Sequence, residues 1–341
     1  MAMKNNGLVS IITPCYNGAD YIYRLFDSIL AQTYNNIEFI FVNDGSTDET
    51  EKVALSYKEK FEEKGIKYIY ISKNNGGVAS AINEGLKVFS GEYLTWPDAD
   101  DWMTPDCIEK KVRYLEDNLD CGMVITQLET RLEETPNACH GVLKFKNTEK
   151  RNIFEDLLLE NYVYVAPIGY MARSSMLLEV CPTRNINDTN RMGQNWQMML
   201  PICYRHPCGF IDEKLGYYLI RANSLSHSGH DLEARYKKIQ AFFELKKNAL
   251  STIHMTDSDR KKYDALVVKR YYKNKLVLAA KLHNKEYLKE TYAVLQQTGQ
   301  VGAGDKIWYL RGRSKAFNVF FGIIVFPIRA WKSLVRRIKK G

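Results

Sequence analysis

The stretch LVSIITPCYNGADYIYRLFDSIL (residues 8–30) contains one complete unit of secondary structure from which the fold can be built. Residues 8–14 are mostly apolar and rich in β-branched side chains, a composition typical of a buried strand. After a polar loop, apolar side chains recur at helical spacing from Ile22 to Leu30, and Asp20 precedes them as a candidate N-cap. The stretch therefore predicts a strand, a polar loop and an amphipathic helix, in that order.

The same unit recurs along the first hundred residues. Further strands are predicted at 37–44, 67–72 and 91–96, and helices at 47–64 and 78–89. Strands that alternate with helices form a mainly parallel sheet, and ligands bind beyond the carboxyl ends of its strands. We therefore expect one ligand site there, because each strand is followed by a polar loop. The loops are PCYNG (14–18), NDGSTD (43–48), KNNGG (73–77) and PDADDW (97–102).

The remainder of the chain is less regular. A helix is predicted at 105–118, strands at 122–126 and 168–173, and a helix at 193–204, whereas residues 231–297 have a purely helical pattern. With 341 residues, of which 45% are hydrophobic and 26% charged, the chain is long enough for one large α/β domain with an appendage, or for two domains.

The net charge of +8 is concentrated at one end of the chain. Residues 306–341 contain five lysines, five arginines and no acidic residue, a local charge of +10, so residues 1–305 carry 8 − 10 = −2. An enzyme that acts on nucleic acid spreads basic residues along its groove, so we expect no nucleic-acid partner. The seven cysteines contain no C-x-x-C pair and no zinc-ligand spacing, which indicates reduced thiols in a cytosolic protein. The apolar run at 8–14 is too short for a secretory signal.

Three carboxylates follow the strand predicted at 91–96. Asp98, Asp100 and Asp101 lie within four positions, where like charges repel one another. A cation is therefore expected between them, and carboxylate oxygens favour Mg²⁺ or Mn²⁺, which also bind substrate phosphates. The alternative is a turn whose aspartates cap the next helix.

Two other loops have compositions that suit a nucleotide. Asp44 ends the strand at 37–44, where its carboxylate can accept a hydrogen bond from a base, while Asp48 and Glu49 suit the start of the following helix. The glycine-rich loop at 73–77 opens a helix, so its backbone amides are expected to face a diphosphate. That loop matches neither the P-loop nor the dinucleotide-binding pattern, which argues against a P-loop NTPase and a dehydrogenase.

In order and spacing, four segments of the chain resemble the nucleotide-sugar-binding half of family 2 glycosyltransferases, which have the GT-A fold. The resemblance is close over about residues 7–125, weaker to about 230, and absent from the tail. It implies a Rossmann-like α/β fold with a mixed, mainly parallel sheet flanked by helices. The segments are VSIITPCYNGADYI (9–22), FVNDGSTDET (41–50), NNGGVASAINEGL (74–86) and GEYLTWPDADDW (91–102).

The resemblance also divides the chain. Residues 1–230 would form the GT-A domain, with a nucleotide-sugar half at about 7–125 and an acceptor half at about 126–230. Residues 231–305 would be a helical extension, and residues 306–341 a basic amphipathic tail.

Donor-binding residues follow from the same resemblance. Asp44 would read the nucleotide base, Asp98 would contact the ribose or the metal, and Asp100 would ligate the divalent ion on the diphosphate. Ile82 stands where the family often has an arginine that helps to hold phosphate, so we expect either the metal or another cation such as Lys73 to replace it. The other donor-binding residues that the resemblance implies are Pro14, Tyr16, Asn17, Asn75, Gly76 and Asn83.

The general base is the point at which the chain departs from the family. Members usually have an acidic pair at the start of a helix, about a hundred residues after the D-x-D motif. Here the amides Gln194 and Asn195 take that place, and an amide does not accept a proton at neutral pH. Three interpretations stay open: Asp188, or after it Asp212, is the base; the amides only orient the acceptor hydroxyl; or the protein binds a sugar nucleotide without transferring it.

Two further site residues are expected. Trp196 follows the amide pair and would face the acceptor sugar. His227 lies in RANSLSHS (221–228), which resembles the family segment that closes over the diphosphate, and would add a metal ligand.

The basic tail has an apolar core of about twelve residues, 317–328, whereas a helix needs roughly 20 residues to span a bilayer. Its basic and aromatic flanks favour a segment that lies in the membrane interface, attracted to anionic lipid by about 1 kcal/mol per basic residue. The alternative is a helix docked on the protein's own surface.

We therefore expect a metal-dependent, inverting glycosyltransferase that uses Mn²⁺ or Mg²⁺. It would move a sugar from a nucleoside-diphosphate sugar to a hydroxyl of a glycan or lipid-linked acceptor. A UDP-sugar is the donor that we expect. The expected place is the cytoplasm, on the inner face of the cell membrane, in surface polysaccharide biosynthesis. The alternative is a catalytically silent subunit that binds a sugar nucleotide or acts as a scaffold.

Overall fold

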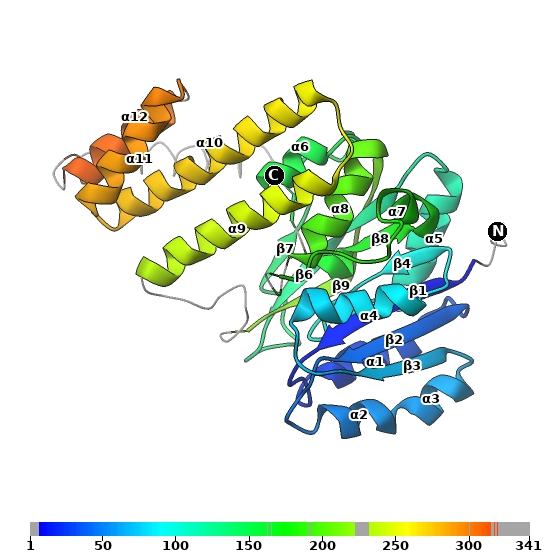
Figure 1. Cartoon of the computed structure of the whole chain (residues 1–341). Coiled ribbons are helices and arrows are strands. Elements are labelled where there is room, and N and C mark those ends of the chain that lie inside the picture. Colours follow the sequence, from blue (N-terminus) through cyan, green and yellow to red (C-terminus); the bar gives the residue numbers. More distant parts are fainter. Residues whose placement is uncertain are drawn as a thin grey trace, which may run out of the picture. The chain divides into compact units, whose positions relative to one another are not determined.

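The computed structural model describes residues 7–161, 163–164, 166–189, 191, 193–221, 232–299, 301–314, 317 and 319 (Figure 1). The chain divides into two compact units. The first contains Met1–Ser228 and Leu245–Arg260, and the second contains Gly229–Glu244 and Lys261–Gly341. Every described residue of the candidate site lies in the first unit.

In the described part of the first unit, nine strands form one sheet in the order β3-β2-β1-β4-β8-β6-β9-β5, with β7 beside β6. Pairing is parallel from β3 to β4 and between β6 and β9, and antiparallel where β5, β7 and β8 join. The expected mixed, mainly parallel sheet is confirmed. The strands are β1 Val9–Cys15, β2 Ile37–Asn43, β3 Lys67–Ser72, β4 Tyr93–Thr95, β5 Trp102–Met103, β6 Met123–Leu132, β7 Gly141–Leu143, β8 Tyr170–Arg173 and β9 Cys208–Ile220.

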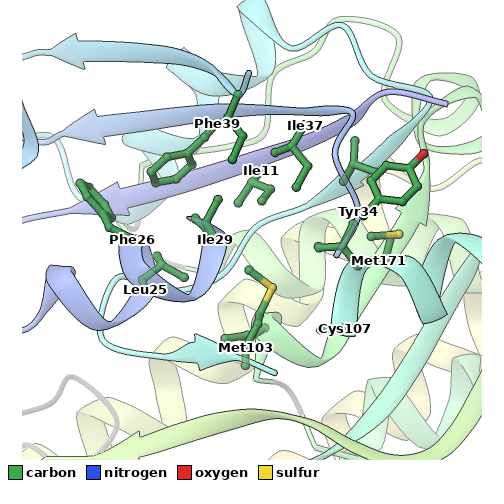
Figure 2. Close-up of a cluster of buried hydrophobic side chains, with 14 of the residues drawn as sticks. Ile11, Leu25, Phe26, Ile29, Tyr34, Ile37, Phe39, Met103, Cys107 and Met171 are labelled. Atoms are coloured by element: carbon green, nitrogen blue, oxygen red, sulfur yellow. The ribbon is translucent and has the colours of Figure 1, made fainter. Parts of the chain in front are cut away.

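Helices cover both faces of the sheet. Adjacent residues of β1 point to opposite faces, so its apolar side chains lie on both sides and pack against a helix on each. On one face Ile11 packs with Phe26 of α1, whose ring meets Phe39 edge-on at 5.1 Å (Figure 2). On the other face Gly85 of α4 lies against Ile12, so closely that an added Cβ would be 2.4 Å from that side chain. The helices before α9 are α1 Ile22–Leu30, α2 Thr50–Ser56, α3 Lys58–Glu63, α4 Val78–Val88, α5 Cys107–Asp117, α6 Phe154–Leu159, α7 Ser174–Val180 and α8 Gln194–Arg205.

Two predictions about helices were wrong. The helix predicted at 47–64 is two helices, α2 and α3, which separate at Tyr57. Its buried ring packs edge-on against Phe26 at 5.1 Å. The N-cap of α1 is Tyr21, which makes no capping hydrogen bond with its side chain, so Asp20 does not have the predicted role.

A long strand was not predicted. β9 has 13 residues and pairs with both β6 and β5, so it connects the D-x-D region to the second half of the sheet. Its middle residues are exposed and charged, so the sequence lacks the alternation of apolar and polar residues that indicates a strand. The short elements β5, β7, α6 and α7 were not predicted either.

The C-terminal part is helical, as expected, with α9 Leu232–Thr252, α10 Asp257–Lys281, α11 Lys285–Gln297 and α12 Ala303–Arg313. In the second unit, Trp308 and Tyr309 of α12 pack against a buried cluster that includes Leu276, Leu288 and Leu295. Helical structure thus continues past residue 306, where the tail was expected to begin. None of the helices in the described residues is long and apolar enough to cross a membrane.

Candidate active site

The carboxyl ends of β1, β2 and β4 meet at one edge of the sheet, because these strands are parallel neighbours. The loops after β1 and β2 are joined there. The N–H of Thr47 donates to the side-chain oxygen of Asn17 (2.8 Å), and the N–H of Asn17 donates to the hydroxyl of Ser46 (2.9 Å). Tyr16 is 49% exposed beside them, whereas Pro14 is buried within β1. Tyr16 and Asn17 therefore lie at the surface of this edge.

Asp44 joins the β2 loop to the glycine-rich loop. Its carboxylate is 3% exposed and accepts hydrogen bonds from the N–H groups of Gly76 (2.9 Å) and Gly77 (2.7 Å). The ammonium of Lys73 lies 2.8 Å from the same carboxylate and also donates to the carbonyl of Asn74. Two expectations are thereby corrected. The amides of Gly76 and Gly77 do not lie open to a diphosphate, and Lys73 is not a spare cation, because Asp44 already engages all three.

Arg191 contacts the same loop and was not predicted. Its guanidinium donates to the side-chain oxygen of Asn75, and its carbonyl accepts from the N–H of Ala79 (3.4 Å). Gly77 has a φ of +91°, and an added Cβ there would lie 2.5 Å from the Cβ of Arg191. Ile82 is completely buried. Arg191 is therefore an exposed cation beside the loop whose helix lacks the expected arginine.

Two side-chain amides hold the segment that leads to Asp188. Asn83 of α4 exchanges two hydrogen bonds with the peptide groups of Ile186 (2.8 and 2.9 Å). Gln197 of α8 does the same with Asn187 (2.7 Å each). Asn83 is 4% exposed and anchors this segment, while its expected contact with the donor stays a prediction. Asp188 comes next in the chain and is exposed.

The amide pair lies at the start of α8. The side-chain oxygen of Asn195 accepts from the indole N–H of Trp96 (2.9 Å), and Gln194 is 8% exposed. Trp196 is only 9% exposed, and the ammonium of Lys246 lies 5.6 Å from the centre of its ring. The expected open aromatic platform at Trp196 is therefore not observed, because the ring is packed within the protein.

The D-x-D carboxylates lie where β4 ends. Burial and the charge of Asp100 raise the pKa of Asp98 to about 7. Burial also raises the pKa of Asp100, against the lowering effect of Arg221, whose Nε is 3.1 Å from its Oδ2. The guanidinium of Arg221 lies 4.2 Å from the ring centre of Tyr21. Two partly buried, mutually repelling carboxylates and one arginine thus share this corner.

Asp101, the third carboxylate, ties this corner to β9. It is fully buried, and its Oδ1 accepts from the N–H of Leu219 (2.9 Å). Its Oδ2 has no hydrogen-bond partner within the described residues. Burial first, and then the charges of Asp100 and Asp98, raise the pKa of Asp101 well above its ordinary value.

Asp212, the second candidate for the base, lies far along β9 from the D-x-D residues. Asp212 accepts a hydrogen bond from Gln127 and lies on β9, seven residues before Leu219. At about 3.3 Å per residue that separation is about 23 Å along the strand. Asp212 is therefore too far from the D-x-D corner to act as the base.

A divalent cation fits the two D-x-D carboxylates. The described residues hold no cluster of three or more His, Cys, Asp or Glu side chains that would bind a metal by themselves. Mg²⁺ and similar ions are commonly bound by one or two carboxylates together with substrate phosphates, which is what Asp98 and Asp100 offer. The predicted third ligand, His227, lies outside the described residues.

Comparisons with known proteins show which family part of the chain resembles. Residues 10–168 match the family model described as Glycosyl transferase family 2. An uncharacterized glycosyltransferase of Rickettsia typhi is 51% identical over 129 residues, which covers 35% of this chain and only 38% of that relative.

Solved structures with low sequence identity show the same fold. S. aureus TarS in complex with UDP-GlcNAc gives a TM-score of 0.58 at 17% identity, over 83% of this chain and 79% of that one. The mannosyltransferase PcManGT of Pyrobaculum calidifontis, in complex with GDP-Man and Mn²⁺, gives 0.56 at 16% identity, over 97% and 85%. The fold is therefore GT-A, and residues 10–168 of the chain match glycosyl transferase family 2.

Proposed function

We propose that this protein is a metal-dependent, inverting glycosyltransferase that moves a sugar from a nucleoside-diphosphate sugar to a hydroxyl group. The observation that carries the proposal is the placement of Asp98 and Asp100 at the sheet edge that also carries Tyr16, Asn17 and Asp44, inside a family 2 domain. We propose a UDP-sugar as the donor, since TarS was solved with UDP-GlcNAc.

The nucleoside is proposed to lie across β1 from the β2 loop to the end of β4. Neighbouring strands are about 4.8 Å apart, so β2 and β4 are separated by about 10 Å, a span that suits a nucleoside with its first phosphate. Asp44 would read the base through Oδ2, which among the described residues accepts from the N–H of Gly77 and keeps a second lone pair. Pro14, Tyr16 and Asn17 would line the pocket between.

Asp98 and Asp100 are proposed to hold Mn²⁺ or Mg²⁺, and His227 remains a proposed third ligand. When bound, such an ion stabilises the negative charge that gathers on the leaving diphosphate. Arg191, beside Asn75, is proposed to supply the phosphate-binding charge that Ile82 cannot, in place of Lys73.

Asp188 is proposed as the general base. Its carboxylate is exposed, and the N–H of Arg191 donates to its backbone carbonyl (2.8 Å), so the two residues close one turn beside Gly77. Asn195 is less suited to orient an acceptor, because its side-chain oxygen already accepts from Trp96. Gln194 and Trp196 would then shape the acceptor side without direct contact with the reacting atoms.

The alternative function is a catalytically silent protein that binds a sugar nucleotide. One observation favours it: the residue at the family's base position, Asn195, is buried and engaged with Trp96.

The biological setting is also a proposal. The chain would use a glycan or lipid-linked saccharide as acceptor in surface polysaccharide biosynthesis. It would lie on the cytoplasmic face of the cell membrane, held to anionic lipid by basic residues of 306–341. In this scheme residues 1–230 are the catalytic domain and residues 231–305 a helical extension.

Donor consumption separates the two functions. The purified full chain is incubated with Mn²⁺ and a panel of UDP-, GDP- and dTDP-sugars, and release of the nucleoside diphosphate is measured. The transferase proposal predicts that one donor class is consumed, and that Asp98→Asn lowers the rate by at least about 10²-fold. Binding of a donor without any consumption would favour the silent protein.

A further inference from the structure

We infer that Arg221 competes with the metal ion for Asp100, so that a divalent cation binds weakly by itself and strongly only together with the nucleotide. This rests on the proposed metal role of Asp98 and Asp100. It concerns a positioning residue that couples the binding of the metal ion to the binding of the nucleotide, and no reaction step passes through it.

The contact geometry carries the first step. The Nε of Arg221 is 3.1 Å from Oδ2 of Asp100, and the two side chains are only 19% and 20% exposed. The contact is an ion pair without a hydrogen bond from Nε, and it places a fixed positive charge beside Oδ2 of Asp100. Because the pair is largely shielded from water, its interaction is screened less than that of a surface pair.

Two further contacts keep Arg221 in place. Its Cζ lies 4.2 Å from the ring centre of Tyr21, a distance that gives a favourable cation–π interaction. Two residues earlier, the N–H of Leu219 donates to the buried Asp101, which fixes the end of β9 beside the D-x-D loop. These two contacts therefore fix the position of Arg221 beside Asp100.

The positive charge of Arg221 weakens the binding of a divalent ion at Asp100. A divalent ion at Asp100 would stand beside the fixed positive charge of Arg221, which repels it, while the ion pair withholds one of the few ligands available. A nucleoside diphosphate brings negative charge to both cations and offsets the repulsion. Metal and nucleotide should therefore each increase the affinity for the other, as linkage requires.

The test is a titration of the full chain with Mn²⁺ at pH 8 in the absence of nucleotide. The electron paramagnetic resonance signal of free Mn²⁺ is measured at each step and gives the affinity. Wild type is compared with Arg221→Gln, which removes the charge, and with Arg221→Lys, which keeps it. The matched control is Arg131→Gln, because Arg131 also lies over a tyrosine (4.8 Å from Tyr217) and pairs with a carboxylate outside the D-x-D (2.6 Å from Glu129).

Arg221→Gln should bind Mn²⁺ at least about 10-fold more tightly than wild type, since one nearby like charge has been removed. Arg221→Lys and Arg131→Gln should stay within about 3-fold of wild type. Saturating UDP should shrink the difference between wild type and Arg221→Gln. Equal Mn²⁺ affinities of wild type and Arg221→Gln, or a gap that UDP leaves unchanged, would overturn the inference.

Variants of the two carboxylates test the proposed metal site separately from the role of Arg221. If Asp98→Asn and Asp100→Asn bind Mn²⁺ with UDP as well as wild type does, the metal site itself is wrong and the inference falls with it. If those variants lose Mn²⁺ but Arg221→Gln behaves as wild type, only the role of Arg221 is wrong.

Discussion

Asn195 stands where the sequence resemblance leads us to expect an acidic residue, and its side chain makes a hydrogen bond without carrying a charge. Its side-chain oxygen accepts from Trp96, a bond that a carboxylate could accept equally well. Trp96 lies two residues before Asp98 in a corner that already holds buried carboxylates with raised pKa values. An amide therefore fixes the end of β4 and adds no further negative charge beside the D-x-D.

A pair of substitutions tests where the base is. Asp188→Asn should lower turnover by at least about 10²-fold if its carboxylate takes the acceptor proton. Asn195→Asp should change turnover by less than about 3-fold, because the bond from Trp96 is kept and the base is elsewhere. Initial rates with the donor that the wild type consumes give both values. A large gain in Asn195→Asp, with no loss in Asp188→Asn, would mean that residue 195 is the base position and that this chain lacks the base.

At the residue level, the sequence predicts the carboxylates better than their partners. Asp44, Asp98 and Asp100 could be placed at one edge of the sheet because they follow predicted strands, and strand ends are local features. That Asp44 would engage Lys73 and the glycine amides could not be read from the sequence, because the bonds join residues about 30 positions apart. Arg191 was missed for the same reason, since its partner Asn75 is 116 positions away.

Among the elements, the contact of the glycine-rich loop with Arg191 depends on Gly77. Its φ of +91° and the lack of a Cβ are both needed for the close approach. Gly77→Ala should lower the free energy of unfolding by roughly 2–4 kcal/mol, the cost of the backbone strain plus that of the clash. Gly65 has a similar φ of +76° with nothing within 4 Å, so Gly65→Ala should cost only about 1 kcal/mol. Urea denaturation measures both.

Equal losses in the two glycine variants would show that only φ matters. In that case Arg191 would not be packed on Gly77, and its proposed role at the phosphate would lose its structural support.

The elements that were predicted are those with local patterns. β1 to β4, α1 and α4 follow from alternating strand and helix periods in adjacent segments. β9 was not predicted because a bulged strand with exposed, charged middle residues lacks an apolar alternation. Its partners β5 and β6 also lie about 85 to 115 positions earlier in the chain. The break between α2 and α3 depends on the packing of Tyr57 against Phe26, which is a tertiary contact.

For the whole molecule, the basic tail is the segment through which we propose a contact with the membrane. Residues 315–341 carry seven of the basic residues and no acidic residue. Truncation after Ser314 removes them but leaves α12, whose Trp308 and Tyr309 pack in the second unit. The truncated protein should no longer sediment with anionic vesicles, because each basic residue contributes about 1 kcal/mol of attraction.

Neutral phosphatidylcholine vesicles serve as the control in that experiment, and donor consumption by the truncated protein shows whether the catalytic domain is intact. Undiminished binding of the truncated protein to anionic vesicles would contradict the proposed membrane role of the tail.

The central claim is that the D-x-D corner holds a metal ion on the diphosphate of the donor. The most direct measurement is a crystal structure of the full chain grown with UDP and Mn²⁺, with an anomalous difference map at the manganese edge. The account predicts one peak between the carboxylates of Asp98 and Asp100, in contact with the diphosphate, with the uracil near Asp44. A nucleotide bound elsewhere, or a bound nucleotide with no manganese at these carboxylates, would contradict it.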